Sequence, residues 1–149
     1  MVTSLKTKKV VVKNSGFVNL SVFMDERGLL AVGEVGKEIP FLIKRFFFIT
    51  DLEKSTSLER GGHAHIKTDQ VIFCLKGSFL LELDDGKTKQ DIFFDNHTWG
   101  IRLGPGLWHK MKKFSPDCVI LVVANRYYKE SDYLRDYSKF LKFVKTVHD

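Results

Sequence analysis

Apolar residues in this chain recur in short runs, and turn residues separate one run from the next. Short runs rich in β-branched and aromatic residues are typical of β-strands. Lys76-Gly77, Asp84-Asp85-Gly86 and Gly104-Pro105-Gly106 supply three of the turns, and Asp-Gly favours the positive φ of a tight hairpin turn. The pattern predicts strands at residues 41–49 (FLIKRFFFI), 70–75, 78–83, 87–94, 98–103 and 118–124 (CVILVVA).

The C-terminal part of the chain has a different hydrophobic period. Its apolar residues recur every three or four positions, which places them on one face of a helix. Ser131 is a good N-cap residue at the expected start, so we expect an amphipathic helix over about residues 131–145. The apolar positions are Tyr133, Leu134, Tyr137, Phe140, Leu141 and Val144.

Many short strands with glycine-containing turns indicate an antiparallel sandwich or barrel. The run at residues 118–124 is apolar throughout, which suits a strand that is buried on both faces. The chain shows no linker, repeat or low-complexity segment, and its 149 residues can bury a core without disulfides or metals. We therefore expect one domain over residues 1–149, an all-β jelly-roll barrel closed by the C-terminal amphipathic helix.

Composition excludes several classes of protein. With 44% hydrophobic and 28% charged residues, the chain has the values of an ordinary globular domain. The three consecutive valines at residues 10–12 are too few for a signal-peptide core, and no apolar run approaches membrane-spanning length. Cys74 and Cys118 lie inside apolar runs without zinc-site spacing, so we expect buried free thiols. These features predict a cytoplasmic protein with no membrane partner.

The chain is basic, with a formal net charge of +6 and a pI of about 9.3. A basic surface can bind nucleic acid, but here the lysines are scattered along the chain. The sequence also lacks a zinc finger, a recognition helix and an aromatic RNA-binding motif. We therefore expect no nucleic-acid partner, whereas small anionic ligands such as nucleotide diphosphates fit the charge equally well.

The residues with the clearest chemical potential lie in the stretch Gly62-His63-Ala64-His65. Side chains alternate faces along a strand, so His63 and His65 point to the same side. Arg60 precedes this pair and Gln70 follows it. Such a pair can bind a metal, transfer protons or pack in a core. Burying titratable groups together is costly, which argues against a purely structural role.

Two motifs resemble those of the cupin family. Residues 62–77, with His63, His65, Gln70 and Gly77, follow the first cupin motif, H-x-H-x(3,4)-E-x(6)-G, with glutamine in the glutamate position. Residues 104–109 (GPGLWH) resemble the second motif, P-x-G-x-x-H, with glycine in the proline position. The resemblance implies that His63, His65, His109 and Gln70 surround the mouth of the barrel. Three imidazoles suit zinc, iron, copper or nickel, but a neutral amide is a poor ligand for these metals. We therefore expect no metal and no other cofactor.

A longer resemblance covers roughly residues 20–141. The chain resembles the dTDP-4-keto-6-deoxyglucose 3,4-ketoisomerases, metal-free sugar-nucleotide cupins of bacterial deoxysugar pathways, including those that make dideoxy-amino sugars for the O-antigen of lipopolysaccharide. It departs from them at Phe47, where similar enzymes tend to carry a tyrosine two residues after the strand arginine. The matching stretches are residues 25–28 (DERG), 39–45 (IPFLIKR), 60–65 (RGGHAH), 75–78 (LKGS), 108–111 (WHKM), 114–119 (FSPDCV), 127–128 (YY) and 132–137 (DYLRDY), with Gln70.

This resemblance implies an isomerase that moves a ketone from C4 to C3 of a dTDP-linked hexose through an enediolate. Such a reaction needs groups that take and return protons, together with cations or hydrogen-bond donors for the enediolate oxygens. His63 and His65 are the expected acid–base pair. The substrate-binding candidates are Arg45 and Arg60 for the enediolate, Arg27, Arg45 and Arg102 for the pyrophosphate, Gln70 and His109 at the mouth, and Trp108 for stacking or core packing.

The sequence is also compatible with other classes of protein. The chain could be a metal-dependent cupin enzyme, a non-catalytic sugar-binding cupin or an inactive partner module. A 3,5-epimerase is disfavoured because the epimerases of this pathway lack the H-A-H pair. The residues leave open the nucleotide, dTDP or UDP, and the product configuration at C4. The resemblance also implies a homodimer, in which the strand around residues 10–12 is a candidate for exchange between subunits.

Overall fold

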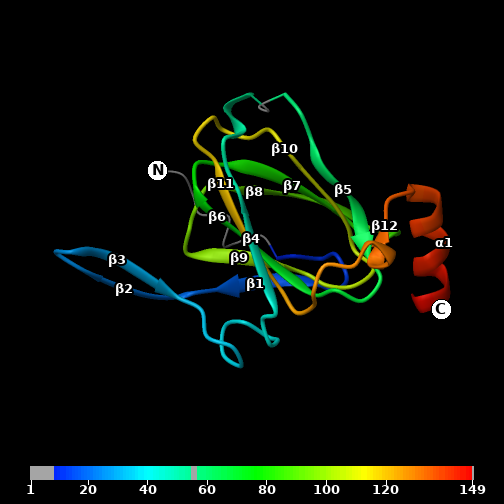
Figure 1. Cartoon of the computed structure of the whole chain (residues 1–149), viewed down its shortest axis with the longest axis horizontal. Coiled ribbons are helices and arrows are strands. Elements are labelled where there is room, and N and C mark those ends of the chain that lie inside the picture. The colour runs from blue at the N-terminus through cyan, green and yellow to red at the C-terminus, as the bar shows by residue number, and fades with distance from the viewer. Residues whose placement is uncertain (1–8, 55–56, 149) are drawn as a thin grey trace.

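The computed structural model describes residues 9–54 and 57–148 (Figure 1). Within these residues the chain forms two facing five-stranded sheets, a projecting two-stranded hairpin and one C-terminal α-helix. All strand pairs within the sheets are antiparallel. The strands form two separate hydrogen-bonded sheets and not one continuous barrel, so the all-β jelly roll with a C-terminal helix is confirmed in this open form.

In the first sheet, the apolar run at residues 118–124 contains β11, which lies between two other strands. β11 pairs with β6 on one edge and with β4 on the other, which buries its backbone hydrogen bonds on both sides. β4 and β1 are the edge strands, and η2 (Leu52–Lys54) follows β4. In spatial order the strands are β1 (Ser15–Asn19), β9 (Trp99–Leu103), β6 (Gln70–Lys76), β11 (Val119–Ala124) and β4 (Arg45–Ile49).

The second sheet brings together strands that are far apart in the sequence. β5 lies between β12 and β10, so each of its edges is paired. β7 and β8 form the hairpin predicted at Asp84-Asp85-Gly86, where the N–H of Gly86 donates to Asp84 Oδ1 at 2.8 Å. In spatial order the strands are β12 (Tyr133–Leu134), β5 (Arg60–His65), β10 (Trp108–Lys112), β7 (Phe79–Asp84) and β8 (Lys89–Phe94).

The hydrophobic core lies between the two sheets. Alternate residues of β7 point inward, and Phe79 and Leu81 are fully buried. Phe94 stacks on Phe79 and also contacts Trp99 of the first sheet, with both pairs of ring centroids 4.6 Å apart. The contact between Phe94 and Trp99 joins the two sheets through the core.

The helix begins later than its sequence pattern predicts. α1 spans Tyr137–His148, whereas the prediction was residues 131–145 with Ser131 as the N-cap. The N-cap role belongs to Asp136, whose Oδ1 accepts a hydrogen bond from the N–H of Lys139 at 3.0 Å. Ser131 lies instead in a short 3-10 turn, η3 (Glu130–Asp132).

Tertiary contacts explain this difference. Asp132 is buried, and its carboxylate accepts hydrogen bonds from the N–H of Lys67 at 2.7 Å and from the hydroxyl of Thr68. The next two residues, Tyr133 and Leu134, pair with β5 as a short strand. Backbone groups that bond to another strand cannot also bond within a helix, so the helix starts only after β12.

The hairpin projects away from both sheets and was not predicted. Among the described residues, β2 (Ser21–Asp25) pairs with β3 (Gly28–Val32) alone, and Figure 1 shows the two strands extending beyond the two large sheets. The turn ends at Gly28, whose φ of +124° favours glycine. Exposed apolar side chains cover the hairpin, including Phe23, Met24 and Leu30.

The N-terminal segment packs against its own chain, and both cysteines lie in the interior. Residues 10–12 form no regular strand, and Val12 is buried in the core of its own chain. Exchange of this segment between subunits stays a prediction, because it is not tested by a single chain. Cys74 and Cys118 are buried and free, as expected. None of the helices in the described part of the chain is long and apolar enough to cross a membrane.

Candidate active site

Strand pairing gathers the predicted histidines on one face of the second sheet. His63 and His65 lie on the same face of β5. On one side of β5, His109 of β10 is directly opposite His63, and on the other side, Tyr133 of β12 is directly opposite His65. Directly opposite residues of an antiparallel pair share a face, so three imidazoles and one phenol form a single group.

The rings of this group are in close contact. The ring centroid of His63 lies 4.7 Å from that of His109 and 5.1 Å from that of His65. The rings of His65 and His109 stack with their centroids 5.5 Å apart. Tyr133 contacts both strand histidines edge-on, with centroid distances of 4.6 Å to His65 and 5.0 Å to His63.

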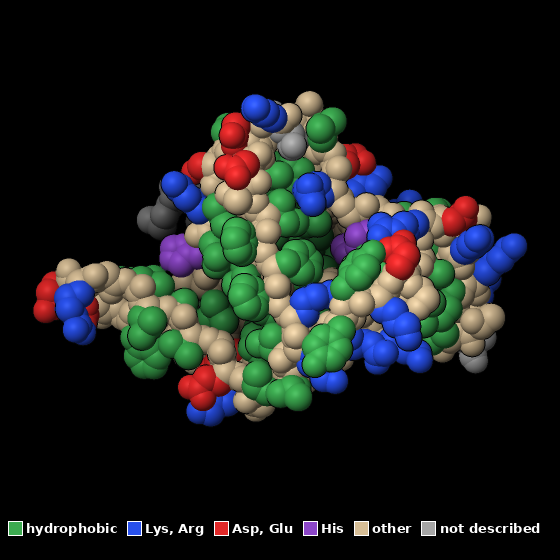
Figure 2. Space-filling view, in the orientation of Figure 1, with side chains coloured by type: hydrophobic (Ala, Val, Ile, Leu, Met, Phe, Trp, Pro, Cys, Tyr) green, Lys and Arg blue, Asp and Glu red, His purple; other side chains and the backbone are tan. Residues whose placement is uncertain are grey.

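A cavity of about 210 Å³ opens between the two sheets beside this group. In Figure 2, histidine side chains lie at the wall of a hollow that basic and apolar side chains surround. His65 is 2% exposed and does not line the cavity, so His63 is the member of the pair that a bound molecule meets. The polar lining residues are Arg60, His63, Gln70, His109, Tyr133 and Arg135.

Burial keeps the three imidazoles uncharged. Loss of water around the rings is the main cause, and it lowers the pKa of His63 to about 2, of His65 to about 3 and of His109 to about 4. The positive charges that neighbouring histidines would carry lower the pKa of His63 and His65 further. Near neutral pH the cluster is therefore neutral, which is the state in which an imidazole accepts a proton.

The hydrogen-bond partners distinguish the three histidines. The Nδ1 of His109 lies 3.2 Å from the carbonyl oxygen of Leu107, which can only accept, so this nitrogen carries the hydrogen and Nε2 is the free acceptor. By contrast, Nδ1 of His63 and Nε2 of His65 are buried without a hydrogen-bond partner among the described residues. Unpaired buried nitrogens are costly, and His63 also lines the cavity, so its unpaired nitrogen marks a place where a bound molecule completes the site.

Two of the predicted arginines lie at the cavity or beside it. Arg60 lines the mouth and is exposed. Arg45 lies at the start of β4, with its guanidinium carbon 5.9 Å from the ring centroid of Phe47 and 5.8 Å from that of Tyr128. Its Nε and Nη1 are buried with no partner in the described part of the chain. A buried guanidinium without a carboxylate favours an anionic ligand.

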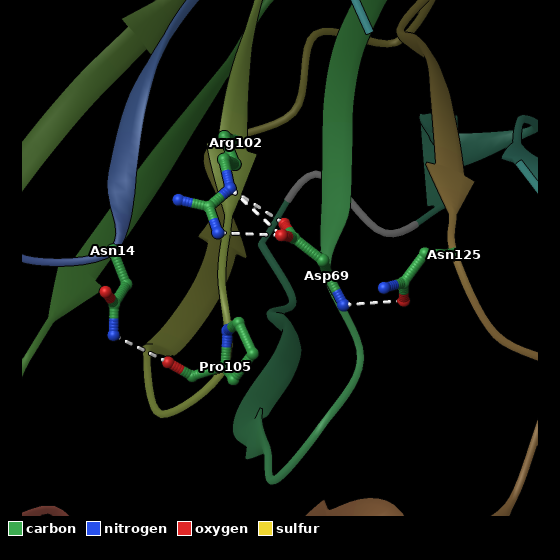
Figure 3. Close-up of polar contacts among 5 residues, drawn as sticks. All are labelled: Asn14, Asp69, Arg102, Pro105 and Asn125. Atoms are coloured by element: carbon green, nitrogen blue, oxygen red, sulfur yellow. Dashed lines mark hydrogen bonds and ion pairs between the residues drawn. The ribbon is translucent and has the colours of Figure 1, made fainter. Parts of the chain in front are cut away.

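Two other predicted arginines are engaged elsewhere. Arg102 forms a bidentate pair with Asp69, with Nε and Nη2 at 2.9 and 2.7 Å from the carboxylate oxygens (Figure 3). Arg27 lies at the tip of the hairpin and pairs with Asp25 at 2.6 Å. Neither arginine lines the cavity of its own chain. For Arg102 the ion pair accounts for the side chain, and Arg27 lines a separate hollow on the hairpin.

Trp108 points away from the cavity because it precedes His109 on β10, and alternate residues face opposite sides. Its ring centroid lies 5.2 Å from that of Tyr137 and 5.4 Å from that of Phe140, so the indole packs under the C-terminal helix. Of its two predicted roles, packing is the one that the structure supports. The opposite wall of the cavity includes Phe47, which offers a ring but no hydroxyl.

Sequence reasoning missed Tyr133 and Arg135. Both line the cavity, but their positions were assigned to the expected helix. The signal that could have found them is the alternation of Tyr133, Leu134 and Arg135, in which two polar residues flank an apolar one as on a strand. A two-residue strand is too short to be recognised by its period alone.

The histidine cluster is also the candidate metal site of the described residues. Ring nitrogens of His63, His65 and His109 all lie within 4.8 Å of one another, and three imidazoles can share an ion such as zinc. Gln70 lines the same cavity, but a neutral amide is a weaker ligand than the carboxylate that usually completes such a set. The geometry therefore permits both metal binding and proton transfer, and the ligand set favours proton transfer.

Known proteins with similar sequences include a sugar-nucleotide isomerase. The family model FdtA, described as WxcM-like, C-terminal, matches residues 13–145. The TDP-4-oxo-6-deoxy-α-D-glucose-3,4-oxoisomerase of Aneurinibacillus thermoaerophilus is 43% identical over 131 residues, which cover 88% of this chain and 93% of that protein.

Solved structures of similar proteins agree with this match. The sugar 3,4-ketoisomerase QdtA of Thermoanaerobacterium thermosaccharolyticum, in complex with TDP, superposes with a TM-score of 0.86 at 33% identity, covering 91% of this chain and 97% of that one. The TDP-quinovose 3,4-ketoisomerase WlaRB of Campylobacter jejuni gives a TM-score of 0.83 at 37% identity, covering 88% and 99% of the two chains.

The lowered histidine pKa values predict a stability loss in mild acid. Unfolded histidines take up protons near their ordinary pKa of 6.5, whereas the folded cluster stays neutral until the pH approaches 4 to 2. The unfolded state thus binds more protons in this window, and the free energy of unfolding falls as the pH is lowered from about 6.5. Urea unfolding of the parent at a series of pH values measures this fall.

A variant that lacks one cluster histidine should show a shallower fall. We expect His65→Gln to lower the slope, whereas His97→Gln, at an exposed position outside the cluster, should keep the slope of the parent. Equal slopes for the parent and His65→Gln would contradict the assignment of neutral imidazoles.

Proposed function

The chain belongs to the FdtA family of WxcM-like, C-terminal domains, and we propose that it converts TDP-4-keto-6-deoxy-D-glucose to a TDP-3-keto-6-deoxyhexose. The observation that carries this proposal is the cluster of neutral imidazoles at a cavity of about 210 Å³. A similar oxoisomerase acts on the TDP-linked 4-oxo sugar, and a similar ketoisomerase binds TDP. The nucleotide assignment rests on these relatives.

The reaction moves two protons and no other atoms. Loss of the C3 proton leaves its electron pair to form a C3=C4 double bond, while the ketone electrons move to the C4 oxygen. The resulting enediolate then collapses in the opposite sense, so that the C3 oxygen becomes the ketone and C4 gains a proton. The protein must therefore supply a carbon base, a route for the oxygen proton and stabilisation of the enediolate.

His63 is the base that we assign to the carbon proton. It lines the cavity, and its imidazole is neutral because burial lowers its pKa to about 2. A neutral imidazole can take the C3 proton and return it to C4 of the same ring. His65 lies behind it with the ring centroids 5.1 Å apart and shares the acid–base role through this contact.

Arg45 and Arg60 are the cations that we assign to the substrate. The buried Nε and Nη1 of Arg45 lack partners among the described residues, and a diphosphate or an enediolate would satisfy them. Arg60 lines the cavity mouth, where an exposed guanidinium can meet the nucleotide part of the substrate. Gln70 and His109 complete the polar lining and are assigned to hydrogen bonds with the sugar.

A homodimer is part of this proposal. The outer face of β4 exposes Phe46 and Phe48, at 66% and 62%, and the hairpin exposes Phe23, Met24 and Leu30, at 62%, 73% and 61%. Exposed apolar patches of this kind mark interfaces with other proteins. Both features lie on one chain, so a second copy can cover each of them in a two-fold symmetric contact.

The unpaired edges of β4 and of the hairpin also favour a second copy of the chain as the partner. In the part of the chain that the structure describes, β4 ends the first sheet with one unpaired edge, and each hairpin strand also has one unpaired edge. Beside them lies an apolar hollow of about 350 Å³, whose lining includes Leu29, Leu121 and Val123. An unpaired edge beside apolar surface is a template for strand addition from another chain. The hairpin is therefore the element that we propose to cross between subunits. We expect the dimer to be located in the cytoplasm.

The histidine pair gives the first test of the function. Incubation with TDP-4-keto-6-deoxyglucose in D2O, followed by proton NMR, should show loss of the C3 proton and a new 3-keto product. We expect His63→Asn and His65→Asn to lower kcat by about 10²-fold or more, the usual scale for losing a general acid–base group. The affinity for TDP should be retained.

His97→Asn is the matched control, because this histidine is exposed and lies outside the cavity. Its turnover should equal that of the parent. If both cluster variants also turn over at the parental rate, the two histidines have only a packing role. A parent that leaves the sugar unchanged would contradict the proposed function itself.

Metal independence is tested by chelation and by one substitution. EDTA should leave the activity of the parent intact. Gln70→Glu would place a carboxylate beside the imidazoles, and a nearby negative charge raises their pKa. A carboxylate beside three imidazoles completes the ligand set of a metal-binding cupin, so this variant should bind divalent metal more tightly. It should lose activity when metal is bound, because a metal-bound His63 cannot accept the C3 proton. The measurements are pH–rate profiles and the metal content after dialysis.

Gln90→Glu, on β8 and outside the cavity, is the control for added charge and should behave as the parent does. Loss of parental activity in EDTA with recovery on adding metal would show that the histidines are ligands, as in the metal-dependent cupin alternative.

The dimer is tested by size-exclusion chromatography with light scattering. The parent should elute as a dimer at micromolar concentration. Phe48→Asp places a charge on the exposed face of β4 and should give monomers, because a buried unpaired charge opposes association. Phe93→Asp changes an exposed phenylalanine of the other sheet and should remain dimeric. A monomeric parent would contradict the proposed interface.

A further inference from the structure

Tyr133 occupies a position in the site that packing alone does not require. It stands opposite His65 in the β12–β5 pair, and its ring contacts His63 and His65 at centroid distances of 5.0 and 4.6 Å. The next residue, Leu134, faces the other way and packs with the buried Ala64 and Phe140. Leu134 of this two-residue strand therefore packs in the apolar cluster, and Tyr133 lines the cavity.

Contacts on both sides fix the segment that carries Tyr133. Asp132 is buried and accepts a hydrogen bond from the N–H of Lys67 at 2.7 Å. After the strand, Arg135 returns over the ring of Tyr133, with its guanidinium carbon 4.4 Å from the ring centroid. A group held at both ends in this way is preorganised, as catalytic groups need to be.

Arg135 is itself held in place by Glu130. The Nε of Arg135 donates to Glu130 Oε1 at 2.9 Å, and the hydroxyl of Tyr128 donates to the same carboxylate. The hydrogen bond from Arg135, followed by that from Tyr128, lowers the pKa of Glu130 to about 2. Glu130 therefore stays ionised, and the guanidinium stays beside the phenol and the cavity.

The cavity holds one hydroxyl among its described lining residues. The other polar groups are two imidazoles, two guanidiniums and the amide of Gln70. Phe47 supplies only a ring on the opposite wall. Guanidinium groups do not give up protons in proteins, and an amide is a poor acid. Tyr133 is therefore the neutral O–H donor available at this surface.

The isomerisation has a second proton that His63 does not account for. As the ketone moves from C4 to C3, the hydroxyl proton moves from the C3 oxygen to the C4 oxygen. A base that carries the carbon proton is occupied as imidazolium while the enediolate exists. A different group must serve the oxygens at that stage.

Resting on the proposed ketoisomerase function, we propose that Tyr133 is a further catalytic residue, which carries the proton between the two substrate oxygens. Its O–H donates to the C4 oxygen as His63 takes the C3 proton and the C3=C4 double bond forms. The tyrosinate then takes the proton of the C3 hydroxyl, the C3 ketone forms and C4 takes the proton from the imidazolium. Tyr133 and His63 both end in their starting states.

The guanidinium of Arg135 supports this transfer. Negative charge resides briefly on the phenol oxygen and on the enediolate, and a fixed cation beside them stabilises that charge without reorganisation. Because Glu130 and not the substrate holds the guanidinium, Arg135 acts here as a positioning residue. A Tyr133 that only filled space would need its ring and not its hydroxyl.

Tyr133→Phe separates these two roles, since it keeps the ring against His63, His65 and Arg135 and removes only the hydroxyl. With TDP-4-keto-6-deoxyglucose as the substrate, we expect kcat to fall by about 10²-fold or more, the scale for losing a proton-transfer group. KM, the affinity for TDP and the melting temperature should stay close to the parental values.

Tyr127→Phe is the matched control, because Tyr127 is 75% exposed and does not line the cavity. It should turn over the sugar as the parent does. If the parent and Tyr133→Phe have equal kcat values, the catalytic role of Tyr133 is overturned while the proposed function stands. If Tyr133→Phe loses TDP affinity or melting temperature in proportion to its activity, the role is structural and the inference is likewise overturned. A parent that does not isomerise the sugar overturns the proposed function and this inference together.

Discussion

The site depends on β5 being paired along both of its edges. β10 brings His109 opposite His63, and β12 brings Tyr133 opposite His65. Each pairing fixes both the register and the face of the side chain that it delivers, so three segments far apart in sequence meet within contact distance. A slip of one residue in either pair would turn the delivered ring to the outer face, and the cluster would be lost.

The sequence predicted those parts of the structure that follow from local pattern. The H-x-H spacing placed His63 and His65 on one face, and the short apolar runs located β6, β7, β8, β9 and β11 to within a few residues. The start of α1 was wrong because the buried carboxylate of Asp132 and the pairing of β12 outweigh helical periodicity. Trp108 and Arg102 had plausible site roles, but strand alternation turns the first outward, and Asp69 binds the second. Such outcomes depend on contacts between distant segments, which a single sequence does not display.

Burial determines the protonation state of the histidine cluster. Three imidazoles in contact cannot all be charged in a poorly hydrated space, and their pKa values fall well below 6.5. The same desolvation keeps each imidazole in its neutral form, which has a nitrogen lone pair that can accept a proton. The carboxylate of a metal-binding cupin would oppose it by favouring the protonated rings, whereas Gln70 keeps the polar lining neutral on that side.

The outer faces of the same strands show how the cluster is held in place. Ala64 lies between His63 and His65 on β5, Leu134 follows Tyr133 on β12, and Trp108 precedes His109 on β10. These three alternate residues belong to one apolar cluster with Phe140 and Val144 of the C-terminal helix. Figure 1 shows this helix beside β5 and β12. Because inward and outward residues alternate on a rigid strand, docking α1 on one face sets the positions of the rings on the other. The amphipathic helix therefore packs behind each of the three strands that carry the cluster. It also holds β12 against β5, because a two-residue strand has few backbone hydrogen bonds of its own.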